Sequence, residues 1–160
     1  RAWILFHILK EIPTRLDYDF MKMINQRDYN SLKKNSQLTK NYLVTSRGSY
    51  KFSFNDYKTN KIYGENVVEV DKPLKLKINL FLKLNDYKVG DDIFPMRRNA
   101  MSNLLTKTSA KIIKKKVSVQ ILRKFYISEK YGGVSQEQVK DAQTMSHSVG
   151  TQQAVYNKTN

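Results

Sequence analysis

The chain lacks cysteine altogether and holds only two histidines among its 160 residues. The absence of thiols excludes a disulfide scaffold, a cysteine-based zinc site and an iron–sulfur cluster. Two histidines, His7 and His147, are too few for a histidine-rich metal site. No run approaches the roughly 18 apolar residues of a membrane span, and the apolar start is too short for a signal peptide. We therefore expect neither a metal centre nor a membrane partner.

Acidic residues are scarce, with 14 Asp and Glu against 29 Lys and Arg and a formal net charge of +15. The default partner of such a chain is a polyanion. The excess concentrates in residues 101–130, where eight basic residues stand against Glu129 alone, a net charge of +7. This stretch is either a solvated basic face or a surface that follows phosphates and releases their counterions. The candidate DNA-binding residues in it are Lys107, Lys111, Lys114, Lys115, Lys116 and Lys124.

The hydrophobic periodicity predicts a mainly α architecture with one small sheet. Apolar residues recur three or four apart over most of the chain, as in helices that bury one face. From residue 41 the period changes to two, which predicts a three-stranded antiparallel sheet, preceded by a polar loop at 30–40. In the helix at 99–115 we expect Leu104, Leu105, Ile112 and Ile113 to face inward. The strands are expected at 42–44, 50–54 and 62–70, and the helices at 3–10, 16–24, 74–84, 99–115, 118–131, from 135 and at 152–156.

Five polar residues stand in an ordered set of motifs. Arg123 lies in Ile-Leu-Arg-Lys, His147 follows 24 residues later in Met-Ser-His-Ser, and Tyr156 comes nine residues after that. Upstream, Arg15 lies in Pro-Thr-Arg-Leu-Asp and Lys58 in Tyr-Lys-Thr-Asn-Lys. This set resembles the catalytic domain of the tyrosine recombinase, or phage integrase, family, and the resemblance covers essentially the whole chain.

The resemblance implies the tyrosine recombinase catalytic-domain fold over residues 1–160. It also implies a site that cuts and rejoins DNA without metal, ATP or any other cofactor. The forked guanidiniums of Arg15 and Arg123 would hold the non-bridging phosphate oxygens. Tyr156 would be the nucleophile that forms a 3′-phosphotyrosine. Lys58 would protonate the departing 5′-oxygen, and His147 would hydrogen-bond the same phosphate.

The sequence departs from the family pattern at several positions. Gln120 stands where the family has a histidine or lysine, three residues before the second arginine. A glutamine can donate a hydrogen bond but cannot act as a proton carrier. Tyr18 replaces an acidic residue, and Ser146 replaces the glycine before the histidine. Lys61 is an alternative to Lys58. We favour Lys58 because a threonine follows it, as in the family turn. The loop at 30–40 looks like an insertion.

Two other functions stay open at this point. A type IB topoisomerase uses the same chemistry, and a basic DNA-binding module with a degenerate site is consistent with Gln120. For the recombinase we expect double-stranded DNA as the partner and a parent protein that is tetrameric on DNA, with this fragment monomeric. We expect an excised catalytic domain without the family's upstream core-binding domain. The Lys- and Asn-rich composition suggests a viral or mobile element, acting in the host cytoplasm or nucleus or packaged in a virion.

Overall fold

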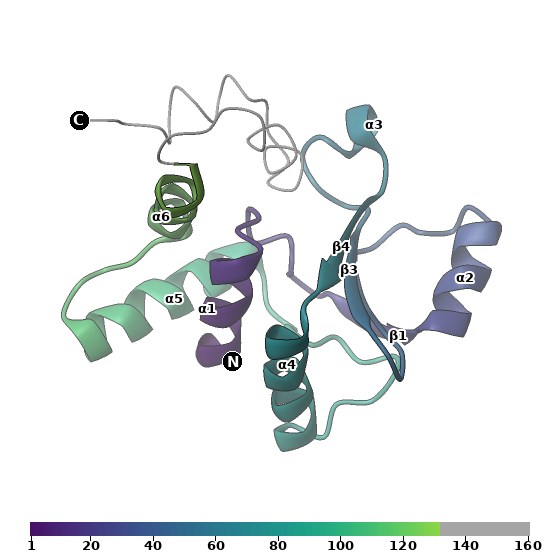
Figure 1. The fold of residues 1–160 in the computed structure, drawn as a ribbon, viewed down its shortest axis with the longest axis horizontal. Helices are drawn as coiled ribbons and strands as arrows, with labels where there is room; N and C mark the ends of the chain where they lie inside the picture. Colours follow the sequence, from purple (N-terminus) through teal and green to yellow (C-terminus); the bar gives the residue numbers. More distant parts are fainter. Residues whose placement is uncertain (132–160) are drawn as a thin grey trace. The chain divides into compact units, whose positions relative to one another are not determined.

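The computed structural model describes residues 1–131, which form parts of two compact units (Figure 1). The sheet unit comprises Asp17–Arg98, together with Arg1. The helical unit comprises Ala2–Leu16 and the chain from residue 99 onward. The chain therefore begins the helical unit, builds the whole sheet unit, and then returns to complete the helical unit.

The sheet has four strands in the order β1-β2-β3-β4, and β1 runs parallel to β2 while the other pairs are antiparallel. The expectation of a three-stranded antiparallel sheet in a mainly α tyrosine recombinase fold is therefore wrong, and the architecture is mixed α/β. The strands at 42–44 and 50–54 are confirmed. The four strands are β1 (Lys22–Asn25), β2 (Tyr42–Thr45), β3 (Tyr50–Phe54) and β4 (Asn66–Val70).

Strand β1 occupies part of the segment where a helix was expected. Leu16 and Phe20 have φ angles of 66° and 48°, in the left-handed region that interrupts a right-handed helix. The chain after them is extended because both of its edges are paired. The Lys22 amide donates to the Asn41 carbonyl at 3.0 Å, and the Met23 amide donates to the Asp91 carbonyl at 2.8 Å. Contacts distant in sequence thus outweigh the local helical spacing.

Helix α2 (Gln26–Lys34) connects β1 to β2, so the expectation of a loop beginning at residue 30 is wrong up to Lys34. Parallel strands need a crossover connection, and a helix is its usual form. The Asn25 side chain caps α2 by accepting from the Asp28 amide at 2.8 Å. The helix packs one face on the sheet through a buried cluster. Its members are Ile24, Tyr29, Tyr42 and Val44.

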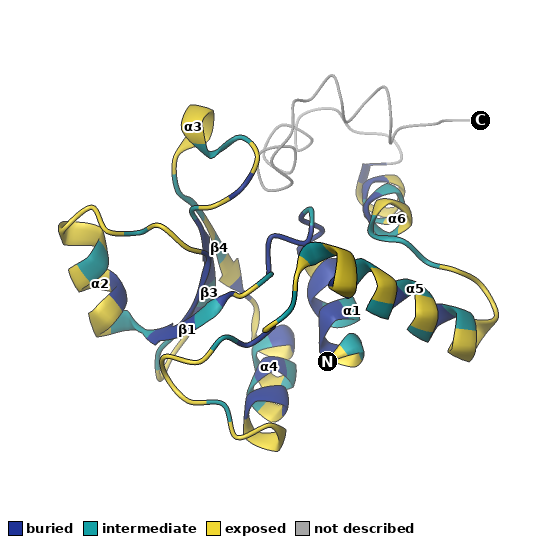
Figure 2. Ribbon diagram, turned by 180° about the vertical axis from the view of Figure 1, so that it is seen from behind, coloured by how far each residue is buried: buried dark blue, intermediate teal, exposed yellow. Residues whose placement is uncertain are grey.

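Aromatic rings fill the other face of the sheet. Tyr18 makes edge-to-face contact with Phe52 at 5.5 Å between ring centroids and with Phe94 at 6.4 Å. Phe94 stacks on Phe81 at 5.8 Å, which brings α4 (Lys72–Leu84) onto this face. The helix at 74–84 is thereby confirmed. In the burial colouring of Figure 2, β1 and β3 are mostly dark, β4 is partly exposed, and α2 and α4 each have an exposed outer face.

The connection from β3 to β4 is a loop with one helical turn, α3 (Asn60–Tyr63), so the strand expected to begin at residue 62 begins at Asn66 instead. The turn ends at Gly64, whose φ of 67° lies in the region that favours glycine. The loop therefore projects beyond the sheet as a compact unit, visible in Figure 1 around α3.

The described part of the helical unit consists of α1 (Ala2–Glu11), α5 (Arg98–Ile113) and α6 (Val119–Tyr131), and α6 contacts α1. The three helices agree with the expected ones, and the Ser118 hydroxyl accepts from the Ile121 amide at the start of α6. Leu105 is buried as expected, but Ile112 and Ile113 are 72% and 54% exposed. The helices expected from residue 135 and at 152–156 lie outside the described residues.

Candidate functional site

The candidate lysine Lys58 lies in the β3–β4 loop, which closes on itself through three hydrogen bonds. The buried Tyr57 donates its hydroxyl to the Gly64 carbonyl at 2.7 Å. The Asn60 side chain donates to the Asn55 carbonyl at 2.7 Å, and the Gly64 amide donates to the Asn60 carbonyl at 2.7 Å. Lys58 is exposed outside this ring. Its ammonium is therefore accessible to a ligand, and the alternative, Lys61 on α3, is exposed as well.

The buried side chain of Asn41 holds the half of this loop that precedes Lys58. Its amide nitrogen donates to the carbonyls of Asp17 at 2.8 Å and Asp56 at 2.9 Å. Its oxygen accepts from the amides of Asn55 at 2.7 Å and Asp56 at 2.8 Å. One side chain thus joins the segment after Arg15 to the start of the Lys58 loop.

We expect Asn41→Leu to lower the free energy of unfolding by about 3 kcal/mol, because it leaves backbone groups without their hydrogen-bond partner. The melting temperature should fall by roughly 6–12 °C for a chain of this size. Urea denaturation followed by circular dichroism measures both the loss and the unfolding slope. Asn103→Leu, on the exposed face of α5, is the matched control. A loss at Asn41 no larger than at Asn103 would contradict the role of Asn41.

Glu65 holds the half of the loop that follows Lys58. Its carboxylate accepts from the Tyr29 hydroxyl at 2.5 Å, the Ser53 hydroxyl at 2.7 Å and the Lys33 ammonium at 2.8 Å. Burial raises the pKa of the Glu65 carboxyl, but the hydrogen bonds from Lys33, Ser53 and Tyr29 outweigh burial and bring the pKa below its ordinary value. Glu65 is therefore ionised at neutral pH and attracts donors from α2 and β3.

The segment after Arg15 is held by ion pairs within the sheet unit. Arg98 contacts Asp17 at 3.3 Å and Asp19 at 3.0 Å, and the Asp17 side chain is only 3% exposed. A guanidinium offers several donors in a fixed fork, so it can bind both carboxylates. Leu16, directly after Arg15, keeps a left-handed φ of 66° while it is buried. For a bulky residue this conformation is strained, and such strain persists where the surroundings determine the backbone.

The helical unit contains both candidate arginines. Arg123 is on α6 and only 5% exposed, although arginine is seldom fully buried. Arg15 is half-buried and follows the end of α1, the helix that α6 contacts. Gln120 lies nearly one turn before Arg123 and is exposed. Lys58 belongs to the sheet unit. His147 and Tyr156 lie outside the described residues.

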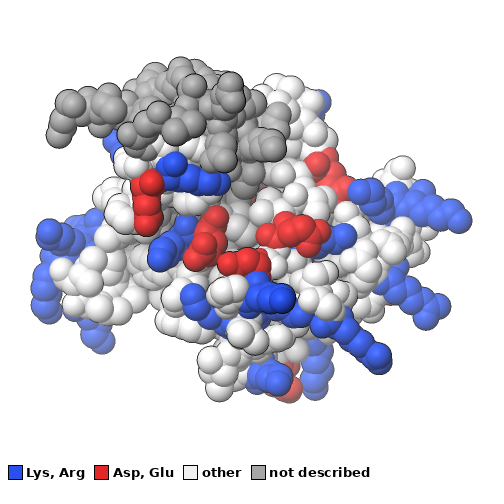
Figure 3. All heavy atoms as spheres, in the orientation of Figure 1, with Lys and Arg blue, Asp and Glu red and all other residues white. Residues whose placement is uncertain are grey.

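The lysines of α5 and of the connection to α6 form an exposed cationic surface. Figure 3 shows basic side chains gathered around the far end of α5, with white surface between them. Lys124 on α6 is half-buried. The surface presents many similar charges, which suits contact with a polyanion backbone of any sequence. Its exposed members are Lys107, Lys111, Lys114, Lys115 and Lys116.

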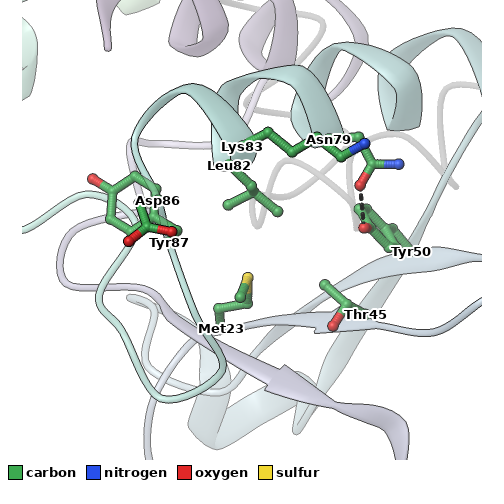
Figure 4. A pocket seen from close by; sticks show the side chains of 8 residues that line it. All are labelled: Met23, Thr45, Tyr50, Asn79, Leu82, Lys83, Asp86 and Tyr87. Atoms are coloured by element: carbon green, nitrogen blue, oxygen red, sulfur yellow. Dashed lines mark hydrogen bonds between the residues drawn. The ribbon is translucent and has the colours of Figure 1, made fainter.

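A pocket of about 350 Å³ lies between α4 and the sheet in the sheet unit (Figure 4). Its base is apolar, with Met23 and Leu82 pointing into it, and Tyr50 donates its hydroxyl to the Asn79 side chain at its rim. Of the residues expected to be catalytic, the four that the structure describes, Arg15, Lys58, Gln120 and Arg123, do not line this pocket. The pocket and the Lys58 loop are therefore separate features of the sheet unit.

Among residues 1–131, no three histidine or carboxylate side chains gather as a possible metal site. No helix of this described part is both long and apolar enough to span a bilayer. No protein-family model, curated protein or solved structure matches the chain.

The roles of Asn41 and Glu65 could not be predicted from the sequence, because single polar residues in polar stretches carry no periodic signal. The acidic residue at the end of the turn Tyr-Gly-Glu was the one available hint. Glycine there indicates a loop end, and a carboxylate beside it has backbone and side-chain donors within reach.

Proposed function

We propose that the chain cleaves and rejoins double-stranded DNA as a tyrosine-type site-specific recombinase, through a covalent 3′-phosphotyrosine and without metal or ATP. The observation that carries the proposal is the pairing of the arginine-bearing segments. α6 holds the buried Arg123 and contacts α1, whose end is followed by Arg15. The two arginines are 108 residues apart in the sequence, yet they belong to one unit.

The chemistry follows from the charge of a phosphodiester. Its anionic oxygens repel a nucleophile, and further charge develops on them in the transition state. Two guanidiniums that stay ionised at any relevant pH, Arg15 and Arg123, compensate this charge. The oxygen of Tyr156 attacks phosphorus as its hydroxyl proton passes to solvent, and the bond to the 5′-oxygen breaks. The ester energy is thereby kept in the phosphotyrosine. Rejoining is the reverse, with the 5′-hydroxyl as the nucleophile.

Proton transfer completes the scheme. Lys58 gives a proton to the departing 5′-oxygen, which suits an exposed ammonium on a projecting loop. His147 donates a hydrogen bond to the phosphate, and Gln120 donates one where the family has a proton carrier. The lysines of the cationic surface hold the DNA backbone. The protein acts as a tetramer on paired sites, inside a host cell.

The test is covalent trapping on DNA. The chain is incubated in EDTA with a randomised pool of nicked duplexes, in which the short strand beyond the cleaved phosphate diffuses away and prevents rejoining. We expect a protein–DNA adduct that survives denaturing detergent and disappears on protease treatment, and its DNA, once sequenced, gives the preferred site. The absence of any adduct, with DNA binding retained, would contradict the proposal and favour a degenerate binding module.

A second assay separates the two enzyme classes. Paired copies of the recovered site should undergo strand exchange, which is read out as recombinant-length products. Relaxation of supercoiled plasmid without such products would indicate a topoisomerase of type IB instead.

A further inference from the structure

Helix α2 contacts the base of the Lys58 loop through Glu65. The Tyr29 hydroxyl and the Lys33 ammonium both come from α2, and both donate to the Glu65 carboxylate at 2.5 and 2.8 Å. The Glu65 side chain is 17% exposed, whereas that of Lys33 is 56% exposed. A hydrogen bond to a partly buried, charged acceptor is stronger than one in open solvent. Glu65 therefore connects α2 with the loop through hydrogen bonds to a carboxylate that is largely shielded from solvent.

Tyr29 is itself rigidly placed. Its ring is buried in the cluster with Ile24, Tyr42 and Val44, so α2 is fixed to the sheet at this point. The Lys51 ammonium lies 4.4 Å from the centroid of the same ring, on the strand that enters the loop. A cation over an aromatic face adds a further attraction. The donor that reaches Glu65 is therefore held by packing as well as by its hydrogen bond.

The two halves of the Lys58 loop are held by different residues. The half before Lys58 is held by Asn41, which accepts from the amides of Asn55 and Asp56. The half after Lys58 ends at Glu65, which accepts from the Ser53 hydroxyl. Lys58 is exposed, so the loop backbone, and not packing around the lysine, fixes where its ammonium reaches. A shift at either anchor moves the ammonium relative to any bound phosphate.

We propose that Glu65 is a positioning residue for Lys58, and that α2, through Tyr29, sets the location of the proton donor. This inference rests on the proposed function, in which Lys58 protonates the leaving oxygen. Proton transfer needs the donor within hydrogen-bond reach of that oxygen, and displacement by about 1 Å costs a large factor in rate. Lys33 of α2 lies in the stretch at 30–40 that looked like an insertion, and that part of the stretch thereby becomes part of the support for Lys58.

The experiment compares two substrates that differ at one atom. In the first the leaving atom is oxygen, and in the second it is sulfur in a 5′-bridging phosphorothioate, which leaves without a proton donor. We expect Glu65→Ala to slow cleavage of the oxygen substrate about tenfold and of the sulfur substrate less than about twofold. Lys58→Ala should show the same pattern with a loss of about 100-fold on oxygen.

Glu65→Gln keeps the shape of the side chain and guards against a folding defect in the alanine variant. Glu69→Gln makes the same change at an exposed carboxylate of β4 and should behave like the wild type on both substrates. The double variant Glu65→Ala, Lys58→Ala should be no slower than Lys58→Ala alone, because a positioning residue acts only through the group it positions. Equal losses on the oxygen and sulfur substrates, or an additive double variant, would overturn the proposal.

Amide hydrogen exchange gives a readout that needs no activity. In Glu65→Gln the Gly64 amide, which donates to Asn60, should exchange about tenfold faster while amides between β2 and β3 stay protected. Unchanged exchange at Gly64 would overturn the anchoring role even if the wild type cleaves DNA. A wild type that forms no adduct overturns the proposed function, whereas faster Gly64 exchange in that case still supports the anchor.

Discussion

Tyr156→Phe is expected to reduce the covalent protein–DNA adduct to background while DNA binding stays within about twofold of the wild type. The change removes a single oxygen, which is the atom that would attack phosphorus. Binding is expected to persist, because under the proposed function the exposed lysines of the cationic surface carry the contact with the DNA backbone. Adduct is measured on denaturing gels with nicked duplexes, and binding by fluorescence anisotropy at a stated salt concentration.

The matched control is Tyr126→Phe, which removes the hydroxyl of a half-buried tyrosine on α6. That variant should form adduct at the wild-type rate. If the adduct persisted in Tyr156→Phe and disappeared in another tyrosine variant, the nucleophile would be misassigned. Mapping the labelled peptide by mass spectrometry would then identify the correct tyrosine among the ten in the chain.

Arg123→Ala is expected to slow cleavage on the order of 10³-fold, because it removes a forked, permanently charged donor from the developing phosphate charge. Arg123→Lys should recover little, since an ammonium cannot reproduce the two parallel hydrogen bonds of a guanidinium. Non-specific DNA affinity should change less than about threefold, as one cation among many. Single-turnover cleavage and anisotropy measure the two effects.

Because Arg123 is 5% exposed, its removal also opens space inside the helical unit. Urea denaturation of each variant therefore accompanies the kinetics, and rates are compared under conditions where both proteins are folded. Arg97→Ala, at an exposed arginine before α5, controls for loss of one positive charge and should cleave at the wild-type rate. Equal losses of cleavage and affinity in Arg123→Ala would contradict a specifically catalytic role.

Elements with local signals were predictable from the sequence. The alternation around Tyr50 and Phe52 gave β3, and the period of three to four after Pro73 gave α4, whose start is further fixed by Asp71 capping the Leu74 amide. Ser118 likewise indicated the start of α6. In each case the residues that make the structure are neighbours in the chain.

β1 was unpredictable for the opposite reason. Its residues follow a helical spacing, and the strand exists because β2 and the chain at Asp91 pair with its two edges. The left-handed conformations of Leu16 and Phe20 carry no sequence signal, since neither residue is a glycine or an asparagine. The fourth strand and the parallel pairing follow from these long-range contacts.

The residues of the candidate site also fall into those with a local sequence signal and those without one. Arg15, Lys58 and Arg123 stand in motifs and could be named in advance, because a motif fixes residue type and order. Asn41 and Glu65 act by satisfying particular backbone and side-chain groups, and those groups come together only in the folded chain. Residues that hold a loop in place are therefore harder to predict than candidate residues that stand in motifs, whose roles here stay predictions.

The division of the chain into a continuous sheet unit and an interrupted helical unit has a consequence for synthesis on the ribosome. Residues 17–98 emerge as one block whose two ends are joined by the Arg98–Asp17 ion pair, so this block can close before the rest is made. The α1 segment, with Ile4, Leu5, Ile8 and Leu9 buried in the finished protein, must wait for α6. During that interval its apolar face is open to chaperones and to other nascent chains. Truncation before α6 should therefore yield a folded sheet unit that carries an aggregation-prone helix at its N-terminus.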